Sequence, residues 1–247
     1  MKLLLMADGK VGFEITKWLI ENYCDDIGMI VTISPNNIYK MSLVYGIKTV
    51  LYSSSKQISD IMYGEGIECD LGLTVWWPYI IKQPLINELE LGFINTHPSL
   101  LPHNRGKHPN FWAIVEEAPF GVSLHMAEEK IDAGDIIAQT EIPYTWEDNG
   151  KTLYERAERA IIKLFIETYP AIRTLDFLRV KQDTVIGSYH NACELDSICK
   201  IDLDKEYNAK DLLNLLRART FEGHPACWFV DKGKTYEVRI GIEKKGR

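Results

Sequence analysis

Short aliphatic and β-branched runs alternate with helical segments over roughly the first hundred residues, and this alternation constrains the fold most. Residues 11–23, for example, carry apolar side chains at the spacing of one helix face. Strands separated by helices in this way form a parallel sheet that is covered on both faces. In such sheets, ligands bind beyond the carboxyl ends of the strands. The expected strands are residues 3–6, 27–33, 49–52, 71–75 and 92–94.

The middle of the chain adds further local signals. Residues 110–117 look helical, and residues 121–126 and 136–142 alternate like extended strands with a turn at 132–134 between them. A capping-box pattern at 152–155 predicts the start of a long amphipathic helix. We expect this helix to pack on the sheet.

The alternation of strands and helices ends near residue 185. Residues 207–217 then form a short helix candidate, and residues 228–239 predict a hairpin that turns at 231–234. We therefore expect an α/β fold with a sheet domain at 1–184. A small α+β appendage that contains the hairpin is expected at 185–247.

The composition predicts a folded chain and argues against two classes of function. With 46% hydrophobic residues, the 247-residue chain can build a full core. Its net charge is −7 and its bases are mixed with acids, which argues against a protein whose main task is to bind nucleic acid. No stretch approaches the ~20 apolar residues of a membrane span, and the N-terminus reads as a strand, not a signal peptide. With five scattered cysteines, taken as reduced thiols, we expect a cytoplasmic protein without nucleic-acid or membrane partners.

Three polar residues carry the candidate chemistry. Asn95 and His97 are two positions apart, so on an extended strand end both side chains point to one face. An imidazole can accept a proton from an amine, since it titrates near pH ~6.5 when unperturbed. The amide of Asn95 can donate to an oxyanion, and the carboxylate of Asp132 can orient His97 and stabilise its cation. This set is suited to acyl transfer to an amine.

Other residues leave alternatives open or exclude a ligand. His125 fits either a supporting role at the site or a hydrogen-bonded role in the core. His103 and His108 share a proline-rich loop, but no carboxylate or cysteine completes a metal site there, so we expect no metal. Gly9 and Gly12 do not complete the dinucleotide fingerprint, which argues against an NAD site.

Four short strings surround the polar residues in a fixed order. They are Asn95-Thr-His-Pro-Ser-Leu-Leu-Pro102, Arg105-Gly106, Gly121-Val-x-Leu-His125 and Asp132-Ala-Gly-Asp-Ile136. Together they resemble the signature of the 10-formyltetrahydrofolate-dependent formyltransferases. The resemblance covers a Rossmann-like core of roughly residues 1–180 and implies Asn95, His97 and Asp132 as the catalytic triad. It also implies N10-formyltetrahydrofolate as co-substrate, in a pocket formed by Trp76, Trp77, Pro78, Tyr79, Ile80, Ala127, Lys130 and Ile131.

Three further runs are Leu73-Thr-Val-Trp-Trp-Pro78, Arg105-Gly-Lys-His-Pro-Asn-Phe-Trp112 and Leu216-Arg-Ala-Arg-Thr-Phe221. These runs are similar to the sugar N-formyltransferases within that family. The resemblance implies a nucleotide-linked amino-dideoxy sugar as acceptor, such as dTDP-4-amino-4,6-dideoxyglucose. The candidate substrate contacts are Arg105, Gly106, Lys107 and Asn110, with the two cations for the diphosphate. Solvated surface charge is the alternative role of both cations.

Three other functions stay open. A methionyl-tRNA formyltransferase would share the triad, but that relative usually carries a larger, more basic C-terminal domain for the RNA. The purine-pathway formyltransferase resembles this core but carries a different glycine loop near its start, which residues 9–12 of this chain do not match. A non-catalytic nucleotide-sugar binding module would not need the complete triad. A homodimer is expected only from the general frequency of dimers among soluble assemblies.

Overall fold

The central element of the fold is a mixed sheet. In the computed structural model, which describes residues 1–82 and 84–246, this sheet has seven strands in the order β3-β2-β1-β4-β5-β7-β8. The first five in that order are parallel, as the alternation of strands and helices predicts. The strands are β1 (Leu3–Ala7), β2 (Ile27–Thr32), β3 (Thr49–Leu51), β4 (Leu71–Val75), β5 (Phe93–His97), β7 (Gly121–Met126) and β8 (Ile136–Glu141).

The last two strands in this order add an antiparallel part to the sheet. β7 is antiparallel to both β5 and β8. No crossover helix lies between β7 and β8, and two strands joined by a direct loop run antiparallel. This loop carries Asp132 and starts at Ala127, whose N–H donates to the carbonyl oxygen of Phe93 at the start of β5. The loop then folds back along β5, so that Asp132 reaches Asn95 and His97 near the carboxyl end of that strand.

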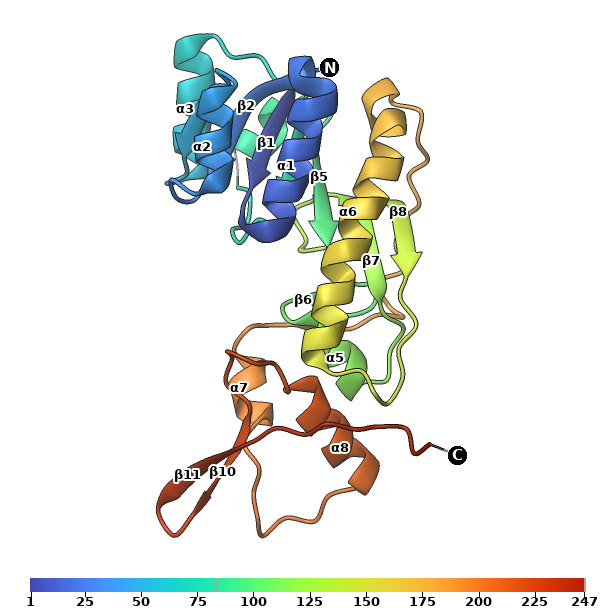
Figure 1. Cartoon of the computed structure of the whole chain (residues 1–247). Coiled ribbons are helices and arrows are strands. Elements are labelled where there is room, and N and C mark those ends of the chain that lie inside the picture. The colour runs from blue at the N-terminus through green and yellow to red at the C-terminus, as the bar shows by residue number, and fades with distance from the viewer. Residues whose placement is uncertain (83, 247) are drawn as a thin grey trace.

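Helices cover both faces of the sheet (Figure 1). Alternate residues of β1 separate into two cores: Leu3 and Leu5 pack with one set of helices, Leu4 and Met6 with another. The first core contains α1 (Gly9–Tyr23), α2 (Asn37–Val44), α5 (Pro109–Val115) and α6 (Gly150–Thr174). The second contains α3 (Ser55–Glu65) and α4 (Leu85–Glu88). A 3-10 turn, η1 (Cys24–Asp26), links α1 to β2.

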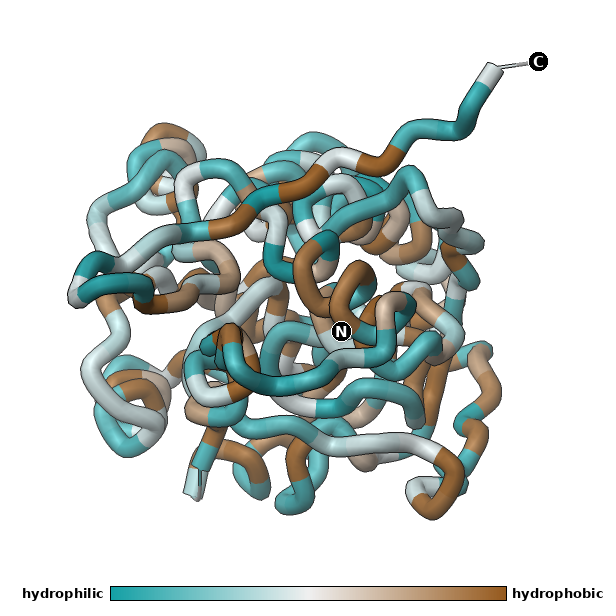
Figure 2. Tube along the Cα trace, turned by 90° about the horizontal axis from the view of Figure 1, so that it is seen from below, coloured by the Kyte–Doolittle hydropathy of each residue, from teal (hydrophilic) through white to brown (hydrophobic). Residues whose placement is uncertain are grey.

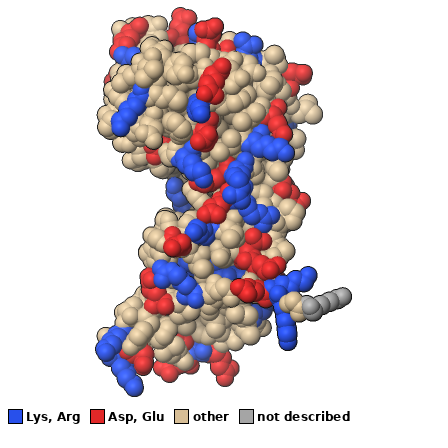
Figure 3. All heavy atoms as spheres, in the orientation of Figure 1, with Lys and Arg blue, Asp and Glu red and all other residues tan. Residues whose placement is uncertain are grey.

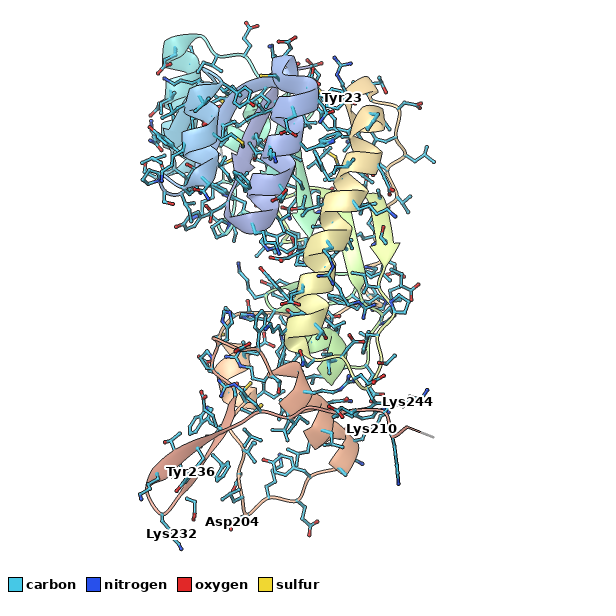
Figure 4. All side chains as sticks on the ribbon, viewed as in Figure 1. Tyr23, Asp204, Lys210, Lys232, Tyr236 and Lys244 are labelled. Carbon is cyan, nitrogen blue, oxygen red and sulfur yellow. The ribbon has the colours of Figure 1, made fainter. Side chains whose placement is uncertain are left out.

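Helix α6 begins earlier than the sequence pattern predicts. Asn149, not Thr152, is the N-cap: its side chain accepts from the backbone N–H of Thr152, whose hydroxyl accepts from the N–H of Asn149. The helix therefore starts at Gly150, where an added Cβ would lie 2.1 Å from the carbonyl oxygen of Ala218. Only glycine permits this close approach between α6 and the appendage. Near the other end of α6, the ring centroids of Tyr169 and Tyr23 are 5.0 Å apart. Tyr23 is labelled at the end of α1 in Figure 4.

The appendage lies beyond the carboxyl ends of the strands (Figure 1). It contains α7 (Glu194–Ile198), α8 (Ala209–Ala218) and the predicted hairpin, β10 (Cys227–Asp231) with β11 (Lys234–Val238). The turn residues Lys232 and Gly233 both have positive φ, at 48° and 73°, as a tight two-residue hairpin requires. The last described residues lead away from the body of the molecule (Figure 2).

A second two-stranded pairing joins the two parts of the chain. The short strands β6 (Arg105–Gly106) and β9 (Tyr189–His190) run parallel to each other. The chain that leaves α6 is therefore fixed beside the loop after β5. Within residues 1–82 and 84–246, no helix is long and apolar enough to cross a membrane.

Candidate active site

The end of β5 places the first two candidate residues. Asn95 and His97 lie two positions apart on this strand and face the same side, as expected. Thr74 in the neighbouring β4 donates its hydroxyl to Oδ1 of Asn95 at 2.7 Å. Because Oδ1 is used in this way, the NH2 group of Asn95 points toward β7.

The amide of Asn95 meets two acceptors. Its Nδ2 lies 3.1 Å from Nε2 of His125 and 3.4 Å from Oδ1 of Asp132. A carboxylate can only accept, so it requires the NH2 side of the amide. The structure therefore brings together all three residues of the predicted triad, which are separated by 37 positions in the chain.

His125 belongs to this cluster, which resolves the two alternatives left by the sequence. Asn95 and His125 are directly opposite each other in the β5–β7 register. The ring Nδ1 lies 2.8 Å from the carbonyl oxygen of Met126, so Nδ1 carries the proton and donates. The other ring nitrogen, Nε2, faces Nδ2 of Asn95 at 3.1 Å and Oδ1 of Asp132 at 3.5 Å. His125 therefore helps to set the direction of the Asn95 amide.

Asp132 is held from several directions. Its Oδ2 accepts the backbone N–H of Gly106 at 3.0 Å and lies 3.5 Å from Nδ1 of His97. Burial would raise the pKa of this carboxyl, but His97, His125 and the Gly106 N–H outweigh burial and hold the pKa well below its usual range. Asp132 is thus a carboxylate throughout the neutral pH range.

His97 is buried and faces this carboxylate. Burial lowers the pKa of His97 below its ordinary value of 6.5, and the charge of Asp132 only partly opposes the shift. The imidazole is therefore neutral at neutral pH, which is the form that a proton acceptor needs. Its Nε2 is buried and has no hydrogen-bond partner among the described residues.

A cavity of about 690 Å³ opens over these side chains. It lies between the sheet and the appendage, where the surface is hollowed in Figure 3. One wall is aromatic and apolar: Tyr79 stacks on Tyr52 at 5.2 Å, and Trp77 meets Tyr52 edge-on at 5.1 Å. Of the residues expected to bind the folate, Trp76, Trp77, Pro78, Tyr79, Ile80, Ala127 and Ile131 line the cavity, whereas Lys130 does not.

The cavity also holds part of the predicted substrate site. Gly106, Lys107 and Asn110 line the cavity. Arg105 does not: it is buried, and its Nη2 donates to the carbonyl oxygen of Thr184 at 3.3 Å. Its neighbour Gly106, predicted as a substrate contact, lines the cavity and also donates its N–H to Asp132 at 3.0 Å.

The appendage adds further residues to the cavity lining, and among them are Arg219 and Phe221 of the run Leu216-Arg-Ala-Arg-Thr-Phe221. Arg219, Phe221 and His224 all line the cavity together with His108. Burial, followed by the charges of Arg219 and Lys107, lowers the pKa of His108, and Asp196 opposes the shift. The Nε of Arg219 is buried without a hydrogen-bond partner among the described residues. Lys107 and Arg219 give this part of the cavity positive charge, which suits an anion.

The chemistry of the site is acid–base and hydrogen bonding. Within residues 1–82 and 84–246, no group of three or more His, Cys, Asp or Glu side chains is placed to hold a metal ion. A neutral imidazole, an ionised carboxylate and an amide NH2 converge on one cavity, which suits proton removal from an amine and stabilisation of an oxyanion.

Two family models match this chain. One, described as formyl transferase, matches residues 52–169, which contain Asn95, His97 and Asp132. The other, described as N-formyltransferase dimerization C-terminal domain, matches residues 194–244 of the appendage. The two matches follow one another along the chain in the order of the two structural parts.

Curated relatives carry two different names. A dTDP-4-amino-4,6-dideoxyglucose formyltransferase of Mycobacterium bovis is 30% identical over 151 residues, which are 61% of this chain and 64% of that protein. A methionyl-tRNA formyltransferase of Geobacillus is 36% identical over 70% of this chain and 53% of its own length. The match thus spans less than two thirds of either relative.

Solved structures resemble the whole chain. A 4-N formyltransferase from Francisella tularensis has a TM-score of 0.83 and 25% identity, and the match covers 99% of this chain and 98% of that one. The formyltransferase PseJ from Anoxybacillus kamchatkensis, solved with UDP-4,6-dideoxy-4-formamido-L-AltNAc and tetrahydrofolate, has a TM-score of 0.59 and 27% identity. That match covers 80% of this chain and 89% of the other.

Proposed function

Because the chain belongs to the formyltransferase family, we propose that it moves a formyl group from N10-formyltetrahydrofolate to the amine of a nucleotide-linked amino sugar. The convergence of Asn95, His97 and Asp132 on one cavity carries this proposal. The same three residues lie within the segment that matches the formyl transferase model.

The roles of the three residues follow from their surroundings. His97, neutral because it is buried, takes the proton that the amine loses as it forms the new C–N bond. Asp132 stabilises the resulting imidazolium across the 3.5 Å gap. Asn95 donates to the negative charge that develops on the formyl oxygen, in place of its long 3.4 Å contact to Asp132. His97 finally returns the proton to the leaving nitrogen.

The aromatic wall fits a folate. When bound, the folate would supply the formyl carbon as the electrophile. Tyr79 and Ile80 are more than half exposed in the cavity wall, so a flat ring could cover them. The indole Nε1 of Trp77 is buried without a partner among the described residues, and it could donate to a polar edge of such a ring.

The basic wall supports an anionic acceptor. Lys107, His108, Arg219 and His224 all line the same cavity. A diphosphate in the cavity would meet Arg219 and Lys107, the Arg and Lys side chains that line it. Together with the names of the mycobacterial and Francisella proteins, this favours dTDP-4-amino-4,6-dideoxyglucose as the acceptor.

Formylation of methionyl-tRNA is the second candidate, because the Geobacillus relative carries that name. The net charge of −7 argues against it, since phosphate contacts dominate affinity for RNA. The same triad would serve both reactions. The acceptor must therefore be decided by assay.

A panel assay tests the proposal. The protein is incubated with N10-formyltetrahydrofolate and, separately, with the dTDP-4-amino sugar, its 3-amino isomer, a UDP-4-amino sugar and methionyl-tRNA. Mass spectrometry of each acceptor then reports a formyl gain. We expect the gain on the dTDP-4-amino sugar. A gain only on methionyl-tRNA would overturn the sugar assignment, and no gain on any acceptor would overturn the activity.

We also propose a homodimer that forms through the hairpin. Tyr236 and Lys232 lie at the free end of the appendage (Figure 4). Val230 and Tyr236 are 47% and 44% exposed, and Tyr236 stacks on Phe229 at 5.4 Å, so the hairpin presents apolar surface to solvent. Light scattering should report twice the chain mass for the wild type and a shift toward monomer for Tyr236→Lys. Lys205→Glu, elsewhere on the appendage, should stay dimeric.

A further inference from the structure

A segment between the sheet and the appendage lies against the loop that carries Asp132. We name residues 180–190 the junction segment. Its first residue, Val180, exchanges two backbone hydrogen bonds of 2.8 Å with Ile136 at the start of β8. Two residues later, Nε2 of the buried Gln182 donates to the carbonyl oxygens of Asp132 at 3.1 Å and Gly134 at 2.6 Å.

The partners of Gln182 fix the orientation of its amide. Both are carbonyl oxygens, which can only accept, so the NH2 group must face them. Oε1 is buried and has no partner among the described residues. An unpaired buried acceptor costs free energy. In the folded chain, both N–H groups of the Gln182 amide donate to the loop, although its Oε1 stays unpaired among the described residues.

The loop needs such support. Asp132 has a φ of 50°, in the left-handed region that non-glycine residues adopt only when their surroundings hold them there. At Gly134 an added Cβ would lie 2.0 Å from the carbonyl oxygen of Met126, so the loop is pressed onto the end of β7. Gln182 bonds to the carbonyl oxygens of both residues.

The same junction segment also supports the side chain of Asp132, through residues 105–107. The N–H of Lys107 donates to the carbonyl oxygen of His190 at 3.0 Å, and β6 pairs with β9. This pairing fixes the backbone of Gly106 beside His190. From this position the N–H of Gly106 donates to the carboxylate of Asp132 at 3.0 Å. One segment therefore supports Asp132 through its backbone and through the donor to its side chain.

We propose that Gln182 is a positioning residue: by binding the carbonyl oxygen of Asp132, it fixes the Asp132 carboxylate against His97. Gln182 does not line the cavity, so it acts through Asp132 and not on the substrate. The inference deepens the proposed function, but its first test does not depend on the identity of the acceptor or on activity.

The first test is an NMR titration of the histidines in the full, ligand-free chain, with the His97 signal assigned from His97→Gln. The ionisable groups that act on the pKa of His97 are Asp132, His125 and Lys107. Gln182→Met keeps the length of the side chain but removes both donors. We expect the pKa of His97 to fall in this variant, because the Asp132 carboxylate is no longer held close. Lys181→Gln, an exposed neighbour, should leave it unchanged.

The second test is kinetic. Gln182→Met should lower kcat on the order of 10- to 100-fold, with little change in the KM of either substrate, since small misplacements of catalytic groups have effects of this size. In an Asp132→Asn background the same change should have little further effect, because its cost acts through Asp132.

An unchanged pKa of His97 in folded Gln182→Met, or an equal loss of kcat in both backgrounds, would overturn the proposal. If Gln182→Met does not fold, Gln182→Asn takes its place: its amide is too short to reach both carbonyl oxygens, and its effect should have the same direction. If the wild type transfers no formyl group, the proposed function fails while the titration still decides the role of Gln182.

Discussion

The carboxylate of Asp132 lies 3.5 Å from the ring Nδ1 of His97, in surroundings that keep the acid ionised and the imidazole neutral. Burial favours the neutral form of both groups, but it determines the protonation state of His97 only. Burial lowers the pKa of His97, whereas hydrogen bonds and neighbouring imidazoles overcome the effect of burial on Asp132. The pair is therefore prepared to accept one proton at neutral pH.

The pH dependence of activity should follow His97. The residue must be neutral to accept a proton, so kcat/KM should rise through its pKa and be flat above it. Burial places that pKa below 6.5. We expect the half-maximal rate below pH 6.5, measured by initial rates of formyl transfer from pH 5 to 8. A rise centred above 6.5 would contradict the assignment of a buried neutral base.

Asp132→Asn should lower kcat and also shift the rise of activity on the acid side of the pH–rate profile, here called the acid limb. Removal of the carboxylate takes away the charge that raises the pKa of His97, so the acid limb should move to lower pH. We expect kcat to fall on the order of 10²- to 10³-fold, because the imidazolium loses its counter-charge. The matched change Asp135→Asn, three positions along the same loop, should leave the limb in place.

Tyr79→Ala should weaken binding of the folate. Tyr79 lines the aromatic wall and stacks on Tyr52 at 5.2 Å. An aromatic contact contributes about 0.5–1.5 kcal/mol, so the KM for the formyl donor should rise from about twofold to about tenfold. The KM for the sugar should not change. Tyr63→Ala, at a side chain that is 93% exposed and outside the cavity, is the control.

Arg219→Gln should weaken binding of the diphosphate. The unpaired Nε of Arg219 is suited to a charged hydrogen bond, whose loss costs about 1.5–3 kcal/mol. Calorimetry should therefore show an increase of about 10- to 100-fold in the Kd of dTDP, and no change for thymidine. Arg239→Gln, which removes a surface pair with Glu237, should bind dTDP like the wild type. Equal weakening by both variants would point to a general charge effect.

Tyr169→Phe should lower the free energy of unfolding by about 2 kcal/mol, since its buried hydroxyl donates to the ionised Asp26 at 2.9 Å. Burial opposes ionisation of Asp26, but Arg173 and Tyr169 hold its pKa below 3.8. The bond therefore adds stability above pH 3.8, and the difference between variant and wild type should shrink as the pH falls through the folded pKa. Urea unfolding at pH 7 and pH 3 measures both effects. Tyr63→Phe should match the wild type.

The sequence predicts those parts of the fold that rest on local periodicity. All five strands of the parallel half and the hairpin turn at Lys232 and Gly233 are confirmed. The alternation pattern does not give the order of strands in a sheet, so it does not place β7 between β5 and β8. The start of α6 is misplaced because Thr152 serves as the third residue of a capping box whose first residue is Asn149.

The site is predicted less completely, for a related reason. Asn95, His97 and Asp132 could be found because they lie in strings of recognisable order. Gln182 is 50 positions from Asp132, and no local pattern connects them. Arg219 and His224 enter the cavity only because the appendage packs against the sheet domain, and Arg105 faces Thr184 because β6 pairs with β9. Such long-range placements need the folded chain.

The central claim is that His97 is the base for formyl transfer to an amine. The most direct test is the single-turnover rate of formyl transfer to the dTDP-4-amino sugar by the wild type and by His97→Ala, with both substrates saturating. We predict that the rate falls on the order of 10²- to 10⁴-fold while folate and nucleotide still bind, the range expected for loss of a general base. A near-normal rate for His97→Ala would contradict the account.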